Sequence, residues 1–233
     1  MELQLPSQIS AEMLADNRAL FSISPCYPGY GTTLGNALRR VLLSSLPGAA
    51  ITAVKIKGAE HEFSTMAHVK EDVVDILLNL KQVRFKIHSD EAVEVKLLVN
   101  GKKKITAKDF EKNNLVEIAN PEQLIATLTN EAGKFELTTI VQKGRGYVPV
   151  EARENEKLEV GYMALDAVYT PIRVVNFNTE HVRVEQMTNY DKLMLDITTD
   201  GTVTPQVAFT QACQILVDHF NLLGNAVLAE AAV

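Results

Sequence analysis

The chain has 233 residues, of which 46% are apolar, and a formal net charge of −6 at pH 7. A chain of this length buries about 70% of its extended surface on folding, so it is long enough for a core of its own. Proteins that bind nucleic acid through their own surface usually carry an excess of basic residues. The balance of 23 Lys and Arg against 29 Asp and Glu therefore argues against such a role.

The cysteines and the N-terminus indicate a soluble, cytoplasmic protein. Cys26 and Cys213 lie far apart and form no Cys-x-x-Cys motif, which argues against a structural zinc site or a disulfide framework. The chain begins Met-Glu-Leu-Gln, without the basic and apolar segments of a secretory signal. The longest uncharged stretch, residues 19–38, contains prolines and glycines and is not expected to cross a membrane as a helix.

The first predicted helix runs from about Thr33 to Leu46, with Thr32 or Thr33 as its N-cap. At about 100° per residue, its apolar side chains share one side that we expect to face the core: Leu34, Ala37, Leu38, Val41 and Leu42. Leu43 falls on the opposite side, between Arg39 and Arg40. This outward face is either a solvated arginine surface with one leucine or a small contact surface for a partner.

Two further helices are predicted, at about residues 67–80 and from Pro205 to at least Leu223, the last with Thr204 as its cap. Two apolar stripes run along the last helix and together cover about half of it, which is more than one sheet face normally covers. The first stripe is Ala208, Ala212, Ile215, His219, Leu222 and Ala226, and the second is Phe209, Cys213, Leu216, Phe220, Leu223 and Val227. We expect one stripe to face the chain's own sheet and the other a second copy. A helix enclosed in a single core is the alternative.

Between and after these helices, apolar residues alternate with polar ones, as they do in strands with one buried face. The alternating segments are 83–88, 93–99, 135–141, 172–177, 182–186 and 193–198. Asn100-Gly101 indicates a hairpin turn, and Asn189-Tyr190-Asp191 indicates a turn between two late strands. Strands linked mostly by hairpins, with few helices, predict the α+β class rather than a doubly wound sheet.

The sequence carries no motif typical of a catalytic or metal site. The five histidines are scattered, and we find no phosphate-binding loop, no nucleophile elbow and no cluster of carboxylates such as catalytic magnesium needs. Glu60-His61-Glu62 is more typical of a polar turn than of a metal site, and Arg145, between two glycines, is offered either to a partner or to internal carbonyls. Two classes of function stay open: an assembly module with protein-binding surfaces, and an enzyme with a dispersed site.

Several long segments resemble the α subunit of bacterial DNA-directed RNA polymerase. The longest is residues 29–45, Gly-Tyr-Gly-Thr-Thr-Leu-Gly-Asn-Ala-Leu-Arg-Arg-Val-Leu-Leu-Ser-Ser, and the others are 75–81, 144–149, 166–171, 184–186 and 191–193. They occur in the family's order and cover most of residues 29–223, whereas the first 28 residues match poorly. Typical members continue into a helical carboxy-terminal domain that binds promoter DNA. The sequence ends at Val233, before such a domain, so DNA contact by this chain is not expected.

The resemblance implies two lobes, a dimerisation lobe of residues 1–47 plus 172–233 and an inserted, mostly β lobe of residues 48–171 with one main helix. It implies a homodimeric, non-catalytic scaffold on which the β and β′ subunits of the polymerase assemble for transcription of DNA into RNA from NTPs. It implies no catalytic, metal-binding or cofactor-binding residue on this chain, because the magnesium of this nucleotidyltransferase lies on β′. A free-standing α+β dimer that binds a small ligand or an unrelated protein is the alternative.

The resemblance also assigns contact residues. Arg39, Arg40 and Leu43 would belong to the β-binding surface, and Lys81 and Leu165 to a contact with the large subunits, chiefly β′. The interface between the two α chains would be formed by Ile215, Leu216, His219, Phe220 and Leu223. Since two identical protomers meet two different partners, one protomer would face β and the other β′.

Overall fold

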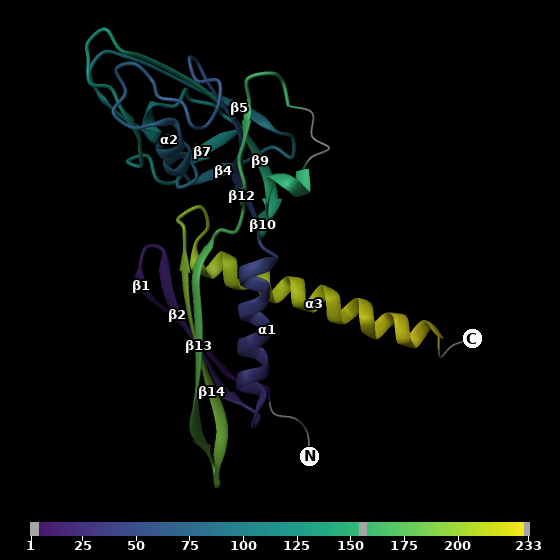
Figure 1. Ribbon diagram of the computed structural model, residues 1–233. Helices are drawn as coiled ribbons and strands as arrows, with labels where there is room; N and C mark the ends of the chain where they lie inside the picture. Colours follow the sequence, from purple (N-terminus) through teal and green to yellow (C-terminus); the bar gives the residue numbers. More distant parts are fainter. Residues whose placement is uncertain (1–4, 154–157, 231–233) are drawn as a thin grey trace. The chain divides into compact units, whose positions relative to one another are not determined.

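The computed structural model describes residues 5–153 and 158–230 of the chain (Figure 1). Contacts divide the chain into two compact units, which we call unit 1 (residues 1–46 and 171–233) and unit 2 (residues 47–170). Unit 2 is thus inserted into the sequence of unit 1. Helices combined with mostly antiparallel sheets confirm the predicted α+β class.

Unit 1 is built on an antiparallel sheet with the strand order β1-β2-β14-β13. These strands are Gln8–Ala15, Arg18–Cys26, Met187–Thr199 and Ile172–Val184, in that order. Apolar side chains alternate along the central strands β2 and β14 and point to one face, as the period of two predicts: Ala19, Phe21, Ile23, Leu193, Leu195 and Ile197 are all buried. This face forms the core of unit 1 together with α1 and α3.

Helix α1 (Tyr30–Ser44) lies on β13 and β14. Its buried positions are Gly31, Gly35, Leu38 and Leu42. Leu38 and Leu42 fall on the predicted core stripe, but Leu34, Ala37 and Val41 are only half-buried. The side of the helix that meets the sheet instead includes Gly31 and Gly35, where the absence of a side chain allows a close approach. The N-cap is Gly29 rather than Thr32 or Thr33, so the helix begins three residues before the predicted start.

Helix α3 (Pro205–Glu230) begins where the Thr204-Pro205 pair predicts, with the Thr204 hydroxyl 3.4 Å from the amide nitrogen of Val207. Its first half packs on α1 and the sheet: Ala208 and Ala212 are buried, and the Phe209 ring stacks on Phe21 with ring centroids 4.5 Å apart. Figure 1 shows the second half extending past α1, away from the sheet.

Unit 2 contains a larger sheet with the strand order β5-β9-β3-β4-β7, and β11 also pairs with β3. The strands are β3 (Pro47–Ile56), β4 (Phe85–Ile87), β5 (Val93–Asn100), β7 (Val116–Ile118), β9 (Lys134–Arg145) and β11 (Met163–Ala164). Two short pairs flank it, β6 (Lys104–Thr106) with β8 (Leu124–Thr127) and β10 (Tyr147–Val148) with β12 (Ala167–Val168). Single turns of 3₁₀ helix occur at Ala107–Asp109 and Val150–Arg153.

Helix α2 (Val73–Leu80) closes the core of unit 2. The predicted helix over residues 67–80 is correct only from Val73 onward. Before it, the carboxylate of Glu71 accepts hydrogen bonds from the amide and hydroxyl of Thr127, and Lys70 donates its amide to the Thr127 carbonyl. These long-range bonds hold the preceding residues against β8, so the helix starts only after Asp72, whose side chain caps the amide of Asp75.

One predicted turn is wrong, and one predicted hairpin does not form. Residues 189–191 lie inside β14, and the chain instead reverses at residues 185–186, where Glu185 has a φ of 53°. Gly101 does turn the chain, with a φ of 83°, but β5 pairs with β9 and not with the segment that follows. At residues 189–191, pairing with β13 keeps the chain extended, and at Gly101 the chain turns but β5 takes the distant β9 as its partner.

We predict that Gly35→Ala destabilises the protein although alanine is the better helix former. A Cβ at this position would lie 2.6 Å from the Phe177 ring and 2.9 Å from Leu193, so α1 or the ring has to move. Overpacking of this kind typically costs about 1–3 kcal/mol. The measurement is the free energy of urea unfolding by circular dichroism. Asn36→Ala, at the exposed neighbouring position, is the control and should be neutral or slightly stabilising. Equal stability of the two variants would contradict the prediction.

Candidate functional site

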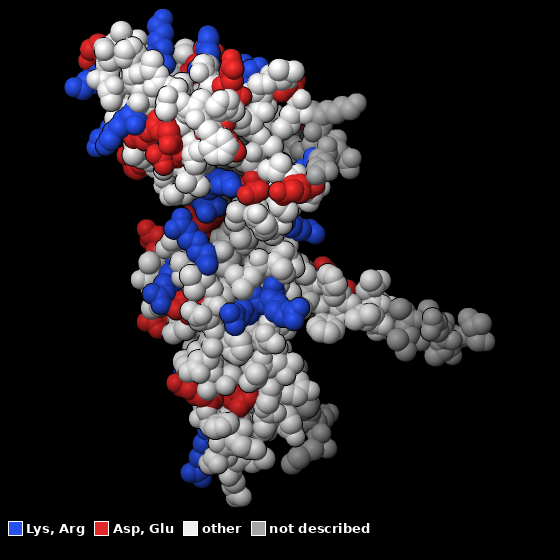
Figure 2. Space-filling model, viewed as in Figure 1, with Lys and Arg blue, Asp and Glu red and all other residues white. Residues whose placement is uncertain are grey.

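The first candidate surface is the outward face of α1. Arg39 and Arg40 are exposed, and Leu43, which falls between them around the helix, is 38% exposed and about 100° away from the buried Leu42. Basic side chains gather over α1 in Figure 2. The face thus offers two guanidinium groups, which can each bind a carboxylate through two hydrogen bonds, beside an apolar contact.

The second candidate surface is the distal half of α3, from Val217 onward. The apolar side chains of this half are exposed: Val217, Phe220, Leu222 and Leu223, with Phe220 at 66% and Leu222 at 71%. A polar stripe consists of Gln214, Asp218, Asn221 and Asn225, and the Gln214 amide donates a hydrogen bond to the Asp218 carboxylate. Isolated apolar residues are normal on a surface, but a continuous apolar stripe on a projecting helix marks a contact with another molecule.

The five residues predicted for a dimer interface divide between two environments. Ile215 and Leu216 are half-buried against the core of unit 1, whereas His219, Phe220 and Leu223 are exposed. The His219 ring donates a hydrogen bond from Nδ1 to the Ile215 carbonyl, 2.7 Å away. Because the distal half of α3 is exposed, the alternative that the last helix is enclosed in a single core is wrong. Ala226 and Val227 lie among the residues whose side chains the structure does not describe.

The third candidate surface lies in unit 2, at the end of α2. The Lys81 ammonium is 3.1 Å from Asp166, and about a third of each side chain is exposed. The second oxygen of Asp166 accepts a hydrogen bond from the Val150 amide, 3.1 Å away. The hydrogen bond from Lys81, with that from Val150, holds the pKa of Asp166 below its usual value.

Leu165, predicted as a contact residue beside Lys81, is only 5% exposed and belongs to the core of unit 2. Its amide donates to the Thr52 carbonyl, and its own carbonyl accepts from the guanidinium of Arg153. These bonds turn the side chain inward, so within this chain it is Lys81 and Asp166 that reach the surface here. The family resemblance, which assigned Leu165 to this contact, did not separate the buried leucine from the half-buried Asp166 that follows it.

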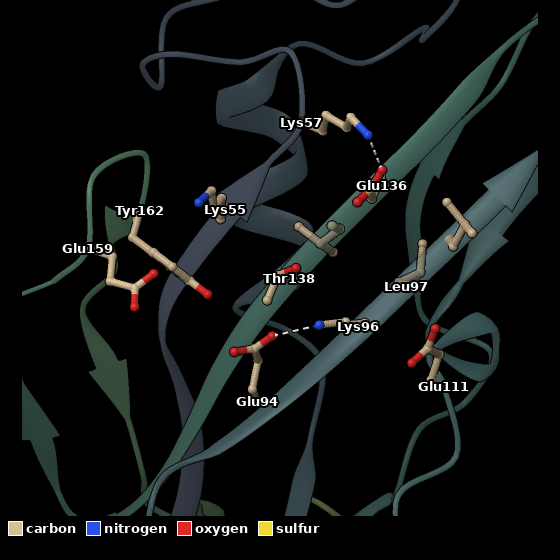
Figure 3. A pocket seen from close by; sticks show the side chains of 12 residues that line it. Lys55, Lys57, Glu94, Lys96, Leu97, Glu111, Glu136, Thr138, Glu159 and Tyr162 are labelled. Carbon is tan, nitrogen blue, oxygen red and sulfur yellow. Dashed lines mark hydrogen bonds and ion pairs between the residues drawn. The ribbon is translucent and has the colours of Figure 1, made fainter.

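A hollow of about 550 Å³ lies over β3, β5 and β9 in unit 2 (Figure 3). Its cations are paired: Lys57 with Glu136 at 2.8 Å, Lys96 with Glu94 at 3.2 Å, and Lys55 over the Tyr162 ring at 5.4 Å from its centroid. Burial, with the nearby Glu94 and Glu159, raises the pKa of Tyr162 above its usual value. This pattern of paired charges is that of a solvated sheet face.

The described residues were also searched for metal-binding clusters and for helices that could span a membrane. Among them, no group of three or more His, Cys, Asp or Glu side chains is placed to hold a metal ion. Burial raises the pKa of the Cys26 and Cys213 thiols, which makes them poor nucleophiles. In the described part of the chain, every helix is too short or too polar to span a bilayer.

Asp191 is a residue whose role the sequence pattern missed, because it was assigned to a turn. It lies in β14, it is only 5% exposed, and one of its oxygens accepts hydrogen bonds from the amides of Gly29 and Gly31 at the start of α1. The signal that could have found it is indirect. The observed helix begins after Gly29, which has no side chain, and has no acidic residue in its first turn, so a carboxylate from elsewhere in the chain can serve as its cap.

Comparisons with known proteins point to one family. Residues 54–170, within unit 2, match the model of the RNA polymerase Rpb3/RpoA insert domain. The DNA-directed RNA polymerase subunit alpha of Moorella thermoacetica is 44% identical over 222 residues, which cover 95% of this chain and 70% of the relative. The subunit of the same name from Carboxydothermus hydrogenoformans is 44% identical over 225 residues, which cover 97% and 71%.

We predict a small, pH-dependent loss of stability for Asp166→Asn. Because the pKa of Asp166 is lowered in the folded chain, its ion pair stabilises the fold above the ordinary carboxyl pKa of about 3.9. This contribution is lost as the pH falls through the lower, folded-state pKa. For a pair that is a third exposed, the loss in the variant should be less than about 1 kcal/mol at pH 7 and should vanish in acid.

The measurement is the free energy of urea unfolding by circular dichroism at pH values between 7 and 3. Asp90→Asn, which breaks an exposed pair with Lys143, is the control and should show no measurable change. A destabilisation of Asp166→Asn that stays constant down to pH 3 would show that the ion pair is not its cause.

Proposed function

The chain belongs to the family of DNA-directed RNA polymerase alpha subunits, and we propose that it acts as the homodimeric platform on which the large subunits β and β′ assemble. The observation that carries this proposal is the exposed apolar surface on the distal half of α3, which a single copy leaves in contact with water. The family of the chain, rather than any pocket, supports assigning this surface to the assembly of RNA polymerase.

Dimerisation through α3 is supported by the layout of the helix. Its proximal half is fixed in the core of unit 1, so the distal half is held out as a rigid rod with Phe220 and Leu223 exposed. Apolar burial contributes about 25 cal/mol per Å², so covering several such side chains at once favours association. A twofold symmetric contact covers the same surface on both copies, which makes a second copy the simplest partner.

Binding of the large subunits is supported by the outward face of α1. Arg39, Arg40 and Leu43 stand on a helix that unit 1 fixes in place, and the dimer carries two such faces. One face would meet β and the other β′, and Lys81 with Asp166 in unit 2 would add a second contact, chiefly with β′. Guanidinium groups at such contacts prefer carboxylates on the partner.

We further propose that this chain supplies structure and no catalytic group. The polymerase reaction requires magnesium ions held by carboxylates, and we assign the site and its metal to β′. The chain would need no cofactor of its own and would make no direct contact with DNA, in keeping with its acidic charge. It would work in the cytoplasm, where a bacterial polymerase transcribes.

We predict that Phe220→Asp gives a folded monomer. Phe220 is exposed in the single chain, so an aspartate there does not disturb the core of unit 1, but a charge in an apolar contact between copies is costly. The molar mass from light scattering at micromolar concentration is the measurement. Asn221→Asp, on the polar stripe, adds the same charge and should stay dimeric. A dimeric Phe220→Asp variant would place the interface elsewhere.

We predict that Arg40→Ala leaves the dimer folded but weakens capture of β by about tenfold or more. The reason is the loss of a charge-assisted hydrogen bond at a contact that becomes desolvated on binding. Binding of purified β to the immobilised dimer is the measurement. Arg183→Ala, which removes another arginine of unit 1 at the far end of β13, is the matched control and should bind normally. Unchanged binding of Arg40→Ala would remove α1 from the β contact.

A further inference from the structure

A buried carboxylate ties the start of α1 to the middle of the unit 1 sheet. Asp191 lies on β14, directly opposite Cys26 on β2 and His181 on β13. Its Oδ2 accepts hydrogen bonds from the amides of Gly29, at 2.9 Å, and Gly31, at 3.2 Å. Its Oδ1 lies 3.4 Å from the Nδ1 of His181. Burying a carboxylate is costly unless it is hydrogen-bonded, so these bonds account for its position.

Asp191 supplies a cap that α1 does not carry itself. The N-cap residue is Gly29, which has no side chain, and the first turn of the helix contains no acidic residue. The amides at a helix N-terminus lack partners within the helix and carry partial positive charge. A carboxylate from another strand satisfies two of them at once and adds a favourable interaction with the helix dipole.

At the N-terminal end of α1, the helix backbone lies close to the sheet. A Cβ at Gly31 would lie 2.8 Å from the Cβ of Asp191, and one at Gly35 would lie 2.6 Å from the Phe177 ring. Glycines allow this approach but add no side chain of their own, and the nearby Leu34 is only half-buried against the sheet. Hydrogen bonds are directional, so the pair ending on Asp191 can fix the position of this end of the helix.

We propose that Asp191 is a positioning residue for polymerase assembly: by anchoring the first turn of α1, it sets where Arg39, Arg40 and Leu43 stand for the large subunit. Arg40 follows Gly31 by nine residues on the same helix, a distance of about 14 Å at 1.5 Å per residue. Because a helix of this length moves largely as a rigid rod, a shift of its first turn would also displace the arginine face, against the packing of Leu38 and Leu42. This inference rests on the proposed function of that face.

The test compares Asp191→Ala and Asp191→Asn in the full-length dimer with Asp196→Asn as the matched control. Asp196 is on the same strand, but its carboxylate pairs with Arg18 at the surface. Three quantities are measured: the molar mass by light scattering, the hydrogen exchange of the Gly29 and Gly31 amides, and the Kd for purified β. Alanine removes both carboxylate oxygens, whereas asparagine keeps one oxygen that can still accept hydrogen bonds from one or both amides. The asparagine variant also serves as the test if the alanine variant does not fold.

We expect both Asp191 variants to stay dimeric, to exchange the two amides faster and to bind β more weakly. The loss of a helix cap predicts a change in Kd of about five- to tenfold for alanine and less for asparagine. Asp196→Asn should match the parent chain in all three measurements. Combined with Arg40→Ala, Asp191→Ala should cost less than the product of the two single effects, because both act on one contact.

Parent-like binding of β by a variant whose amides exchange faster would overturn the positioning role. The positioning role would also be overturned if the changes in Kd caused by Asp191→Ala and Arg40→Ala multiplied in the double variant, because independent effects would indicate general destabilisation. The proposed function fails in a different way: Arg40→Ala alone then binds β normally. In that case a loss of binding in the Asp191 variants could not act through the arginine face, and the inference falls with it.

Discussion

The packing of α1 on β13 and β14 is the contact on which unit 1 depends. Leu38 and Leu42 of this helix complete the core over the sheet, and the proximal half of α3 packs on the helix in turn. Both surfaces that we assign to assembly are therefore placed by one contact: the arginine face is the reverse side of α1, and the projecting half of α3 continues a segment held against it. The close approach at Gly31 and Gly35 allows this arrangement.

Helix α3 illustrates how one element can serve two cores. Along its first half, small residues and Phe209 match the space between α1 and the sheet. Beyond Leu216 the helix has left that space, yet its apolar period continues, with a polar stripe on one side. A sequence selected only for a soluble monomer would be expected to turn polar at this point, since exposed apolar surface favours association.

The parts of the fold that could be predicted from the sequence are those set by neighbours in the chain. Alternation along β5 and β9, the Thr204-Pro205 start of α3 and the outward position of Leu43 all follow from local periodicity and capping. These features could be predicted from the periods of helices and strands and from the capping residues alone. The α+β class followed from them, because strands with one apolar face must pair and be covered.

The rest could not be predicted, because partners far away in the sequence decide it. The cap of α1 comes from Asp191, about 160 residues later, and residues before α2 are held by Thr127. Locally, residues 189–191 have the composition of a turn, but Tyr190 and Asp191 pair with β13, and Asp191 also pairs with β2, which keeps the chain extended. The resemblance assigned both Leu165 and Lys81 to a contact, but the Leu165 amide donates to the Thr52 carbonyl and the Arg153 guanidinium donates to the Leu165 carbonyl, and the leucine side chain lies in the core.

The insertion of unit 2 between the halves of unit 1 has a consequence for biosynthesis. As the chain leaves the ribosome, β1, β2 and α1 appear first, but β14, which lies between β2 and β13, ends only at Thr199. Residues 47–170 form a continuous segment with its own core, so they can fold while the first 46 residues still lack their sheet. Helix α1 therefore reaches its final packing on β13 and β14 only after residues 172–199 have been synthesised, long after the helix itself has left the ribosome.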